Sequence, residues 1–290
     1  MDFLPKKSRA LLKFYGGKSF LARRIISLFP EHTIYCEGFA GAAAVLLNKK
    51  RSDVEILSDV NPSLINLLTV VGSPLLYPLF RDVVVRSGKN KTGLEYNESV
   101  FEMAKLFQGH NSTGVGAAVA YLVKCRYSRI GMGKSFSWSD RFRGGQYGEL
   151  NAWMNLKKDL DSIHSRLNGV QVKLVGRIDG AGYNVFDVMK EVEGPDTVFY
   201  LDPPYLHETR SVKSAFGVHE MTSYEHEKLL KFLLGVQAKA IFISCYWSDL
   251  YSAILGVKGG GWDYTYWNCP NNSGMNKVKE RRREYCWFRI

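Results

Sequence analysis

Four consecutive residues, Asp202, Pro203, Pro204 and Tyr205, are the clearest candidates for chemistry, because they directly follow the apolar run 198–201. Such a run predicts a buried strand, and ligands of open α/β sheets bind outside the carboxyl ends of strands. Two prolines stiffen the backbone and leave carbonyls without competing N–H donors. Asp202 and the Pro203 carbonyl would then accept hydrogen bonds from an exocyclic amine such as that of adenine, and Tyr205 would stack on an extruded base. The same residues are also typical of a tight turn.

A second candidate site is the small-residue turn at 37–43, which separates a predicted strand at 33–37 from a predicted helix at 42–47. Its glycines permit close approach of a ligand. Asp59 ends the next predicted strand about twenty residues on, a spacing at which a carboxylate commonly binds ribose hydroxyls. The pair indicates a nucleoside-containing cofactor, while close packing of strand and helix would account for the glycines alone. The expected contacts are Glu37, Phe39, Gly41 and Asp59.

A third candidate is the segment 13–18, KFYGGK, in which basic and aromatic residues surround two glycines. Beside a cofactor cleft, Lys18 would meet a carboxylate and Phe14 would line the wall. Taken alone, the segment is a loop.

The elements that must position these residues alternate between strand and helix. Strand–helix units at 33–47 and 54–70 predict a parallel, wound α/β sheet. From residue 74 to 155 the chain holds helical pieces and a stretch rich in Gly, Ser, Arg and aromatic residues, which predicts an inserted domain. The α/β pattern resumes at 156, so that residues 1–73 and 156–290 would form one domain.

The later α/β part contains several short elements. Helices are expected at 156–167, 185–190 and 224–234, and strands at 170–175, 197–201 and 240–244. The basic and then aromatic stretch 277–290 resembles a closing edge strand.

The bulk properties describe an ordinary globular chain of 290 residues with a formal net charge of +11. Such a charge favours a polyanionic partner, since neutralised phosphates release counterions. No signal peptide or spanning segment is evident, which predicts a cytoplasmic protein without membrane association. The five cysteines form no C-x-x-C pair, and no histidine has the spacing of a metal ligand, so neither a disulfide framework nor a metal is expected.

Taken together and in this order, the segments KFYGGK, EGFAGAAAV, SDVNPSLIN, NVFDVM and LDPPYLHETR resemble the alpha-group (GATC-type) DNA adenine methyltransferases of bacteria and their phages. The near-terminal RRREYCWF is similar to that family's closing strand. The resemblance implies a Rossmann-like methyltransferase sheet that uses S-adenosylmethionine, with an inserted, mainly helical target-recognition domain at 74–155. It also implies transfer of a methyl group to N6 of a flipped-out adenine in double-stranded DNA without a metal. A monomer is the default expectation, because nothing in the sequence indicates the oligomeric state.

Residue roles follow from the resemblance at the matching positions. Phe14, Lys18, Asp59, Asp187 and Asp202 would contact S-adenosylmethionine or its surroundings, beside the turn residues Glu37, Phe39 and Gly41. Asp202, Pro203 and Tyr205 would be catalytic, with Pro204 as a rigid spacer. The expected DNA contacts are basic and aromatic positions of the insertion together with the N-terminal motif: Lys13, Lys124, Arg126, Tyr127, Arg129, Lys134 and Arg141.

Two departures from the family pattern are Phe14, where tryptophan is usual, and Ala43, where glycine is commoner. Because the region 123–133 lacks the asparagine-rich pattern of GATC-reading members, the target sequence stays open. N4-cytosine methylation, RNA adenine methylation and non-catalytic DNA binding are the alternatives. The basic run 277–283 is either solvated charge or a contact to a DNA strand.

Overall fold

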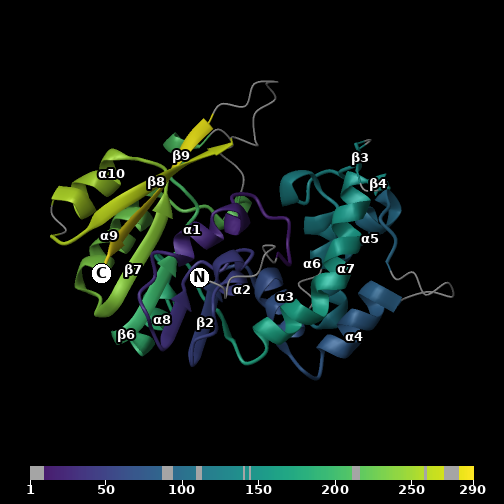
Figure 1. Cartoon of the computed structure of the whole chain (residues 1–290), viewed down its shortest axis with the longest axis horizontal. Helices are drawn as coiled ribbons and strands as arrows, with labels where there is room; N and C mark the ends of the chain where they lie inside the picture. The colour runs from purple at the N-terminus through teal and green to yellow at the C-terminus, as the bar shows by residue number, and fades with distance from the viewer. Residues whose placement is uncertain are drawn as a thin grey trace. The chain divides into compact units, whose positions relative to one another are not determined.

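The computed structural model (Figure 1) describes residues 10–86, 94–108, 113–139, 141–143, 145–210, 216–257, 260–270 and 281–290. The basic positions Lys277 and Lys279 lie outside the described residues. Contacts within the chain group it into two compact units. The helical unit comprises residues 1–26, 41–51 and 61–172, and the sheet unit comprises residues 27–40, 52–60 and 173–290.

The sheet unit is built on a seven-stranded sheet with the order β5-β2-β1-β6-β7-β9-β8. β1 (Ile34–Glu37) pairs in parallel with β2 (Val54–Asp59) and with β6 (Gly194–Leu201), and β6 pairs in parallel with β7 (Ala238–Cys245). β5 (Gln171–Leu174) lies beyond β2. The chain moves outward from β1 through β2 to β5 and then crosses to β6. The neighbours β1 and β6 therefore form the switch point at which wound α/β sheets bind ligands. The predicted α/β fold class is confirmed.

The last two strands form an antiparallel hairpin. β9 (Arg281–Arg289) pairs with both β7 and β8 (Asp263–Pro270). The prediction that the C-terminal segment forms the edge strand is therefore wrong, since β9 lies inside the sheet and β8 forms the edge. β8 was missed although its sequence, DYTYWNCP, alternates aromatic and polar residues.

Apolar side chains of three helical segments cover one face of this sheet. These segments are α8 (Val185–Val192), α9 (Ser223–Gly235) and α10 (Asp249–Tyr251) with the following turn Ser252–Val257. Their buried residues share one core with Cys36, Phe199 and Ile241 of the strands. On the opposite face, Phe29 packs against aromatic side chains of three strands: Tyr35, Tyr200 and Phe242.

The helical unit contains most of the remaining elements (Figure 1). The short helices are α1 (Ala22–Ile26), α2 (Ala44–Asn48) and α4 (Tyr77–Arg81), and the longer ones are α3 (Pro62–Gly72), α5 (Glu98–Gln108), α6 (Val115–Arg126) and α7 (Gly148–Leu167). β3 (Phe142–Arg143) and β4 (Gln146–Tyr147) form a small antiparallel hairpin before α7. α3 begins where the Asn61 side chain accepts hydrogen bonds from the N–H groups of Ser63 and Leu64.

Polar contacts join the helices of this unit. The Asn66 amide on α3 both donates to and accepts from the backbone of Gly114, which precedes α6. Asp161 on α7 accepts hydrogen bonds from Tyr77 and Arg81 of α4. α7 starts eight residues before the predicted helix at 156 and runs unbroken through residue 155. The predicted domain limits stay a prediction, while the compact units divide the chain at other residues.

No single helix among the described residues has the length and apolar character needed to span a membrane. α3 and the following segment Tyr77–Val85 reach that length only together, and they are bent by 102°.

Candidate functional site

Acidic residues end three neighbouring strands of the sheet unit. Glu37 is the last residue of β1, Asp59 is the last residue of β2, and Asp202 follows β6. The register pairs Glu37 with Leu57 and with Tyr200, so all three parallel strands end at the same edge. The carboxylates at this edge therefore lie where a wound α/β sheet is expected to bind its ligand.

The turn after β1 is fixed to both neighbouring strands. Gly38 N–H donates to the Tyr200 carbonyl at 3.2 Å, and Ala40 N–H donates to the Ser58 carbonyl at 2.9 Å. The Ser58 hydroxyl returns a hydrogen bond to the Gly38 carbonyl at 3.1 Å. A Cβ on Gly38 would lie 2.9 Å from both Leu201 and Val185, so close packing explains this glycine.

The predicted cofactor contacts of the sheet unit differ in their surroundings. Glu37 is buried and accepts a 2.9 Å hydrogen bond from the Tyr35 hydroxyl, whose pKa is raised by burial and by this carboxylate. Asp59 and Phe39 are half-buried. Asp187 is exposed and accepts from the Asn184 N–H at 2.7 Å, completing a capping box at the start of α8. A local structural role therefore explains Asp187.

Tyr205 is fixed at the carboxyl edge by two contacts. Its ring, 8% exposed, packs edge-on against Tyr246 with 4.7 Å between centroids. Its hydroxyl donates to Oε2 of Glu284 on β9 at 2.6 Å. Burial, Glu284 and Asp202 raise the pKa of Tyr205, so the phenol keeps the proton that it donates. Sequence reasoning missed Glu284, because only the pairing of β9 with β7 brings it to Tyr205.

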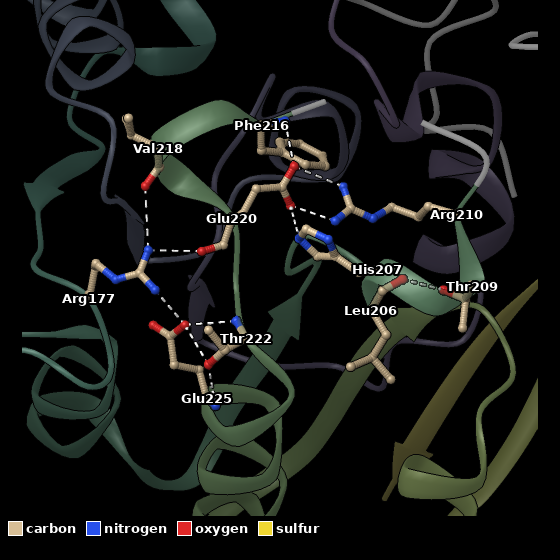
Figure 2. Close-up of polar contacts among 10 residues, drawn as sticks. All are labelled: Arg177, Leu206, His207, Thr209, Arg210, Phe216, Val218, Glu220, Thr222 and Glu225. Atoms are coloured by element: carbon tan, nitrogen blue, oxygen red, sulfur yellow. Dashed lines mark hydrogen bonds and ion pairs between the residues drawn. The ribbon is translucent and has the colours of Figure 1, made fainter. Parts of the chain in front are cut away.

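The segment after the tetrapeptide folds around Glu220 (Figure 2). The guanidinium of Arg210, 6% exposed, donates to both Glu220 oxygens at 2.5 and 3.2 Å, and Phe216 N–H donates at 2.9 Å. His207 Nε2 lies 3.4 Å from the same carboxylate. Glu220 thereby ties the residues next to the tetrapeptide to residues 216–220. No sequence spacing marks Arg210 and Glu220 as partners.

Arg177 holds the same segment from its other side (Figure 2). Its guanidinium donates to the carbonyls of Val218 and Glu220 and to the Glu225 carboxylate, the last at 2.6 Å. Glu225 also accepts from the Thr222 N–H and so caps α9. One arginine therefore joins the start of α9 to the loop before it.

His226, the next residue of α9, is fully buried, and its Nδ1 lies 3.0 Å from the Tyr251 hydroxyl. Burial lowers the pKa of His226 to about 4, with the Pro204 backbone acting in the opposite direction. The imidazole is therefore neutral near pH 7 and serves the packing around the tetrapeptide.

The N-terminal motif lies in the helical unit. Lys18 is buried and its Nζ donates to the Gly16 carbonyl at 2.8 Å. The Phe14 ring lies beside Gly41, where an added Cβ would be 3.5 Å from Cε1 of Phe14. Gly41 and Ala43 both have positive φ, at 45° and 49°. Glycine adopts this conformation without the cost that Ala43 bears, which gives a physical reason for the family's glycine at that position.

Lys13 joins this motif to the predicted recognition region within the same unit. Its Nζ lies 2.7 Å from Oε2 of Glu149 and also donates to the Ser128 carbonyl at 3.4 Å. Gly131, with φ of 76°, approaches so closely that an added Cβ would lie 2.0 Å from the Lys13 carbonyl oxygen. The loop at 129–133 therefore rests directly on the backbone of the N-terminal motif.

The predicted DNA contacts of the insertion separate into buried and exposed residues. Tyr127 is fully buried and donates to the Glu95 carbonyl at 2.9 Å, and the Arg126 guanidinium donates to the Leu11 carbonyl at 2.8 Å. Burial lowers the pKa of Arg126 to about 10. Structural roles explain both residues. Lys124 is half-buried, and the exposed basic residues are Arg129, Lys134 and Arg141.

Exposed aromatic side chains accompany these basic residues. Phe142 and Tyr147 of the β3–β4 hairpin are 65% and 40% exposed, and Trp138 is 49% exposed. The Trp138 and Tyr147 rings lie 5.0 Å apart. Among the described residues, no three His, Cys, Asp or Glu side chains gather in a group that could hold a metal ion.

Comparisons with known proteins found similar solved structures and similar curated sequences. Two structures of the rRNA methyltransferase AviRa from Streptomyces viridochromogenes align with 93% of this chain and 83% of their own, at 11% identity and TM-scores of 0.37 and 0.38. The chain is 38% identical over 94 residues to the DNA adenine methylase of Serratia marcescens, which is 32% of each chain. It is 45% identical over 69 residues to the DNA adenine methylase of Haemophilus influenzae, or 23% of this chain and 24% of that protein.

These alignments span about a third or less of the curated relatives' length. Residues 14–103 match the model of the D12 class N6 adenine-specific DNA methyltransferases, a range that includes the N-terminal motif, the turn at 37–43 and Asp59 but not residues 202–205. Over residues 14–103 the chain is therefore similar to the D12 class N6 adenine-specific DNA methyltransferases.

Proposed function

We propose that this protein transfers a methyl group from S-adenosylmethionine to N6 of adenine in double-stranded DNA. The observation that carries the proposal is the position of residues 202–205, which follow β6 at the switch point of the sheet, with Tyr205 held by Glu284. The relationship of residues 14–103 to adenine-specific DNA methyltransferases supports the choice of substrate.

The residues at the carboxyl edge fit a nucleoside cofactor that also carries an amino acid. Half-buried Asp59 would accept hydrogen bonds from ribose hydroxyls beside the rigid turn at 37–40. S-adenosylmethionine would supply a methyl group activated by its positively charged sulfur. Within the helical unit, Phe14 would offer an apolar wall next to Gly41, and Lys18 a positive charge for a carboxylate.

Asp202 and Pro203 would act on the amine that receives the methyl group. The Asp202 carboxylate and the Pro203 carbonyl would accept hydrogen bonds from its two N–H groups and turn its lone pair toward the methyl group, while Pro204 keeps the backbone stiff. Tyr205 would give the extruded adenine an aromatic surface of fixed orientation. The N6–methyl bond would form as the methyl–sulfur bond breaks, one amine proton would be released, and no covalent enzyme intermediate would be needed.

The helical unit would recognise the DNA duplex. Arg129, Lys134 and Arg141 are exposed cations for phosphates or guanine edges, with Lys124 half-buried near them in sequence. Phe142 and Tyr147 would contact sugars or bases. Lys13 would act through the loop at 129–133 that rests on it, and we propose that the protein works as a monomer.

The test is incubation of the purified protein with labelled S-adenosylmethionine and, in parallel, unmethylated genomic DNA or RNA, followed by digestion and identification of the labelled nucleoside. N6-methyladenine is the expected product, and Asp202→Ala should abolish it while retaining DNA binding. N4-methylcytosine, label in RNA only, or DNA binding without any product would each overturn the proposal in favour of a different function.

A further inference from the structure

The β8–β9 hairpin extends beyond the carboxyl edge of the parallel sheet. β7 ends at Cys245, opposite Tyr285 of β9. β8 and β9 continue to pair beyond this point, from Trp267 opposite Glu284 to Pro270 opposite Arg281. This continuation is a two-stranded ribbon, and among the described residues no strand pairs with it on its β7 side. Because β6 and β7 are in register at Leu201 and Ile243, the ribbon starts at the level of the catalytic tetrapeptide.

The part of the β8–β9 hairpin that leads into the ribbon carries an exposed aromatic surface. Side chains alternate along strands, so Tyr264 and Tyr266 share a face with Tyr285 and Arg283. Tyr264 and Tyr266 are 43% and 45% exposed. The Arg283 guanidinium lies over the Tyr266 ring at 4.9 Å, and the Tyr266 and Tyr285 rings are 5.4 Å apart.

Trp247, two residues beyond the end of β7, extends this surface. It is 40% exposed, and its ring lies 5.5 Å from that of Tyr264 and 5.3 Å from that of Tyr285. The aromatic surface is therefore continuous from the end of β7 across β9 to the edge strand β8.

The charge of the ribbon is positive. Three consecutive arginines occupy positions 281–283, and Arg282 also packs on an aromatic ring, that of Tyr246, at 5.7 Å. Glu284 and Arg282 lie on the face opposite Arg283, where the Glu284 carboxylate accepts a hydrogen bond from the Tyr205 hydroxyl. Stacking on the rings orders both guanidinium groups while their charges stay available to anions.

We propose that this ribbon is a second DNA-binding surface that grips the duplex backbone beside the target base, with Arg283, Tyr266 and Tyr264 on one face and Arg282 on the other. The major groove of B-DNA admits a two-stranded ribbon, and arginines neutralise phosphates. The inference rests on the proposed function for its partner, DNA. The ribbon belongs to the sheet unit, so the inference does not depend on the exposed cations of the helical unit.

The test is the salt dependence of duplex DNA binding by the full chain. Arg283→Ala and Arg282→Ala should each weaken binding and reduce the slope of log K against log salt by about 0.9 per lost phosphate contact. Arg283→Lys should keep most of the slope, which separates lost charge from misfolding. Tyr266→Ala should weaken binding with an unchanged slope.

Lys231→Ala is the matched control for charge. Lys231 is an exposed lysine on α9, close to the helix end that leads into the start of β7 and so toward the amino edge of the sheet. Binding by Arg283→Ala and Arg282→Ala that equals binding by Lys231→Ala in affinity and slope would overturn the inference. Adenine methylation by the wild type is measured separately. If the arginine variants lose DNA affinity and slope as expected while the wild type does not methylate DNA, only the proposed function is refuted.

Discussion

Tyr205 is held at both ends of its side chain, by the edge-on Tyr246 ring and by the Glu284 carboxylate. A base that stacks on a tyrosine benefits when the ring does not have to be ordered on binding. Glu284 is therefore a positioning residue for the proposed reaction, acting through Tyr205.

A double-mutant cycle tests this contact. Tyr205→Phe and Glu284→Gln should each lower the free energy of unfolding, and the double variant should lose less than the sum because one hydrogen bond to a carboxylate is shared. We expect a coupling energy of about 1 to 3 kcal/mol from chemical denaturation. Strictly additive losses would contradict the contact.

Asp59 gives a prediction for cofactor binding. Asp59→Ala should weaken S-adenosylmethionine binding by about 1.5–3 kcal/mol, because a charge-assisted hydrogen bond is lost. Calorimetric titration measures this change, and an unfolding curve serves as the control for stability. Unchanged affinity would refute the ribose role.

His226 predicts how stability depends on pH. Its folded pKa of about 4 lies below the usual 6.5, so between these values the unfolded chain binds a proton that the folded chain does not. The contribution of His226 to the free energy of unfolding should therefore be constant above pH 6.5 and fall by ~3 kcal/mol as the pH drops to about 4. The difference between wild type and His226→Gln, measured by denaturation across that range, should show this fall, and a flat difference would contradict it.

Sequence reasoning selects residues from local signals along the chain and misses those that depend on pairing over distance. The tetrapeptide at 202–205 follows an apolar strand, which periodicity detects. Glu284 meets Tyr205 only through the antiparallel insertion of β9 beside β7, and Arg210 meets Glu220 only through an irregular loop. Tyr127 appeared to be a DNA contact because composition does not distinguish a buried tyrosine from an exposed one.

Among the elements, the parallel strands were the most predictable. β1, β2, β6 and β7 occupy the expected positions to within a few residues, since fully buried strands are continuous apolar runs. β8 was not predicted, although Tyr264, Thr265 and Tyr266 show the alternation of aromatic and polar residues that favours a strand with one exposed face. α7 was predicted too short because its first turns follow a Gly-rich hairpin that hides the helical period.

The loop at 129–133 gives a prediction about the contact between two elements. Gly131→Ala would place a Cβ against the Lys13 carbonyl, whereas Gly145→Ala, at a similar φ of 82°, would meet no atom within 4 Å. The second variant should cost about 1–2 kcal/mol of stability for the conformation alone, and the first should cost several-fold more. Thermal unfolding compares them, and equal losses would show that the loop does not rest on the N-terminal motif.

The molecule as a whole combines an α/β sheet unit with a helical unit, and the net charge of +11 agrees with the exposed cations of both. Three segments contribute residues 27–40, 52–60 and 173–290 to the sheet unit, so its site is assembled from distant parts of the chain. The family resemblance accordingly rests on the order of several motifs and not on any single motif.

The most direct test of the central claim compares wild type with Asp202→Asn, which keeps the shape of the side chain but removes its charge, in a single-turnover assay on unmethylated duplex DNA. The account predicts N6-methyladenine from the wild type, loss of most of the transfer rate in the variant, and similar DNA affinity for both. Transfer by Asp202→Asn at the wild-type rate, or a product other than N6-methyladenine, would contradict it.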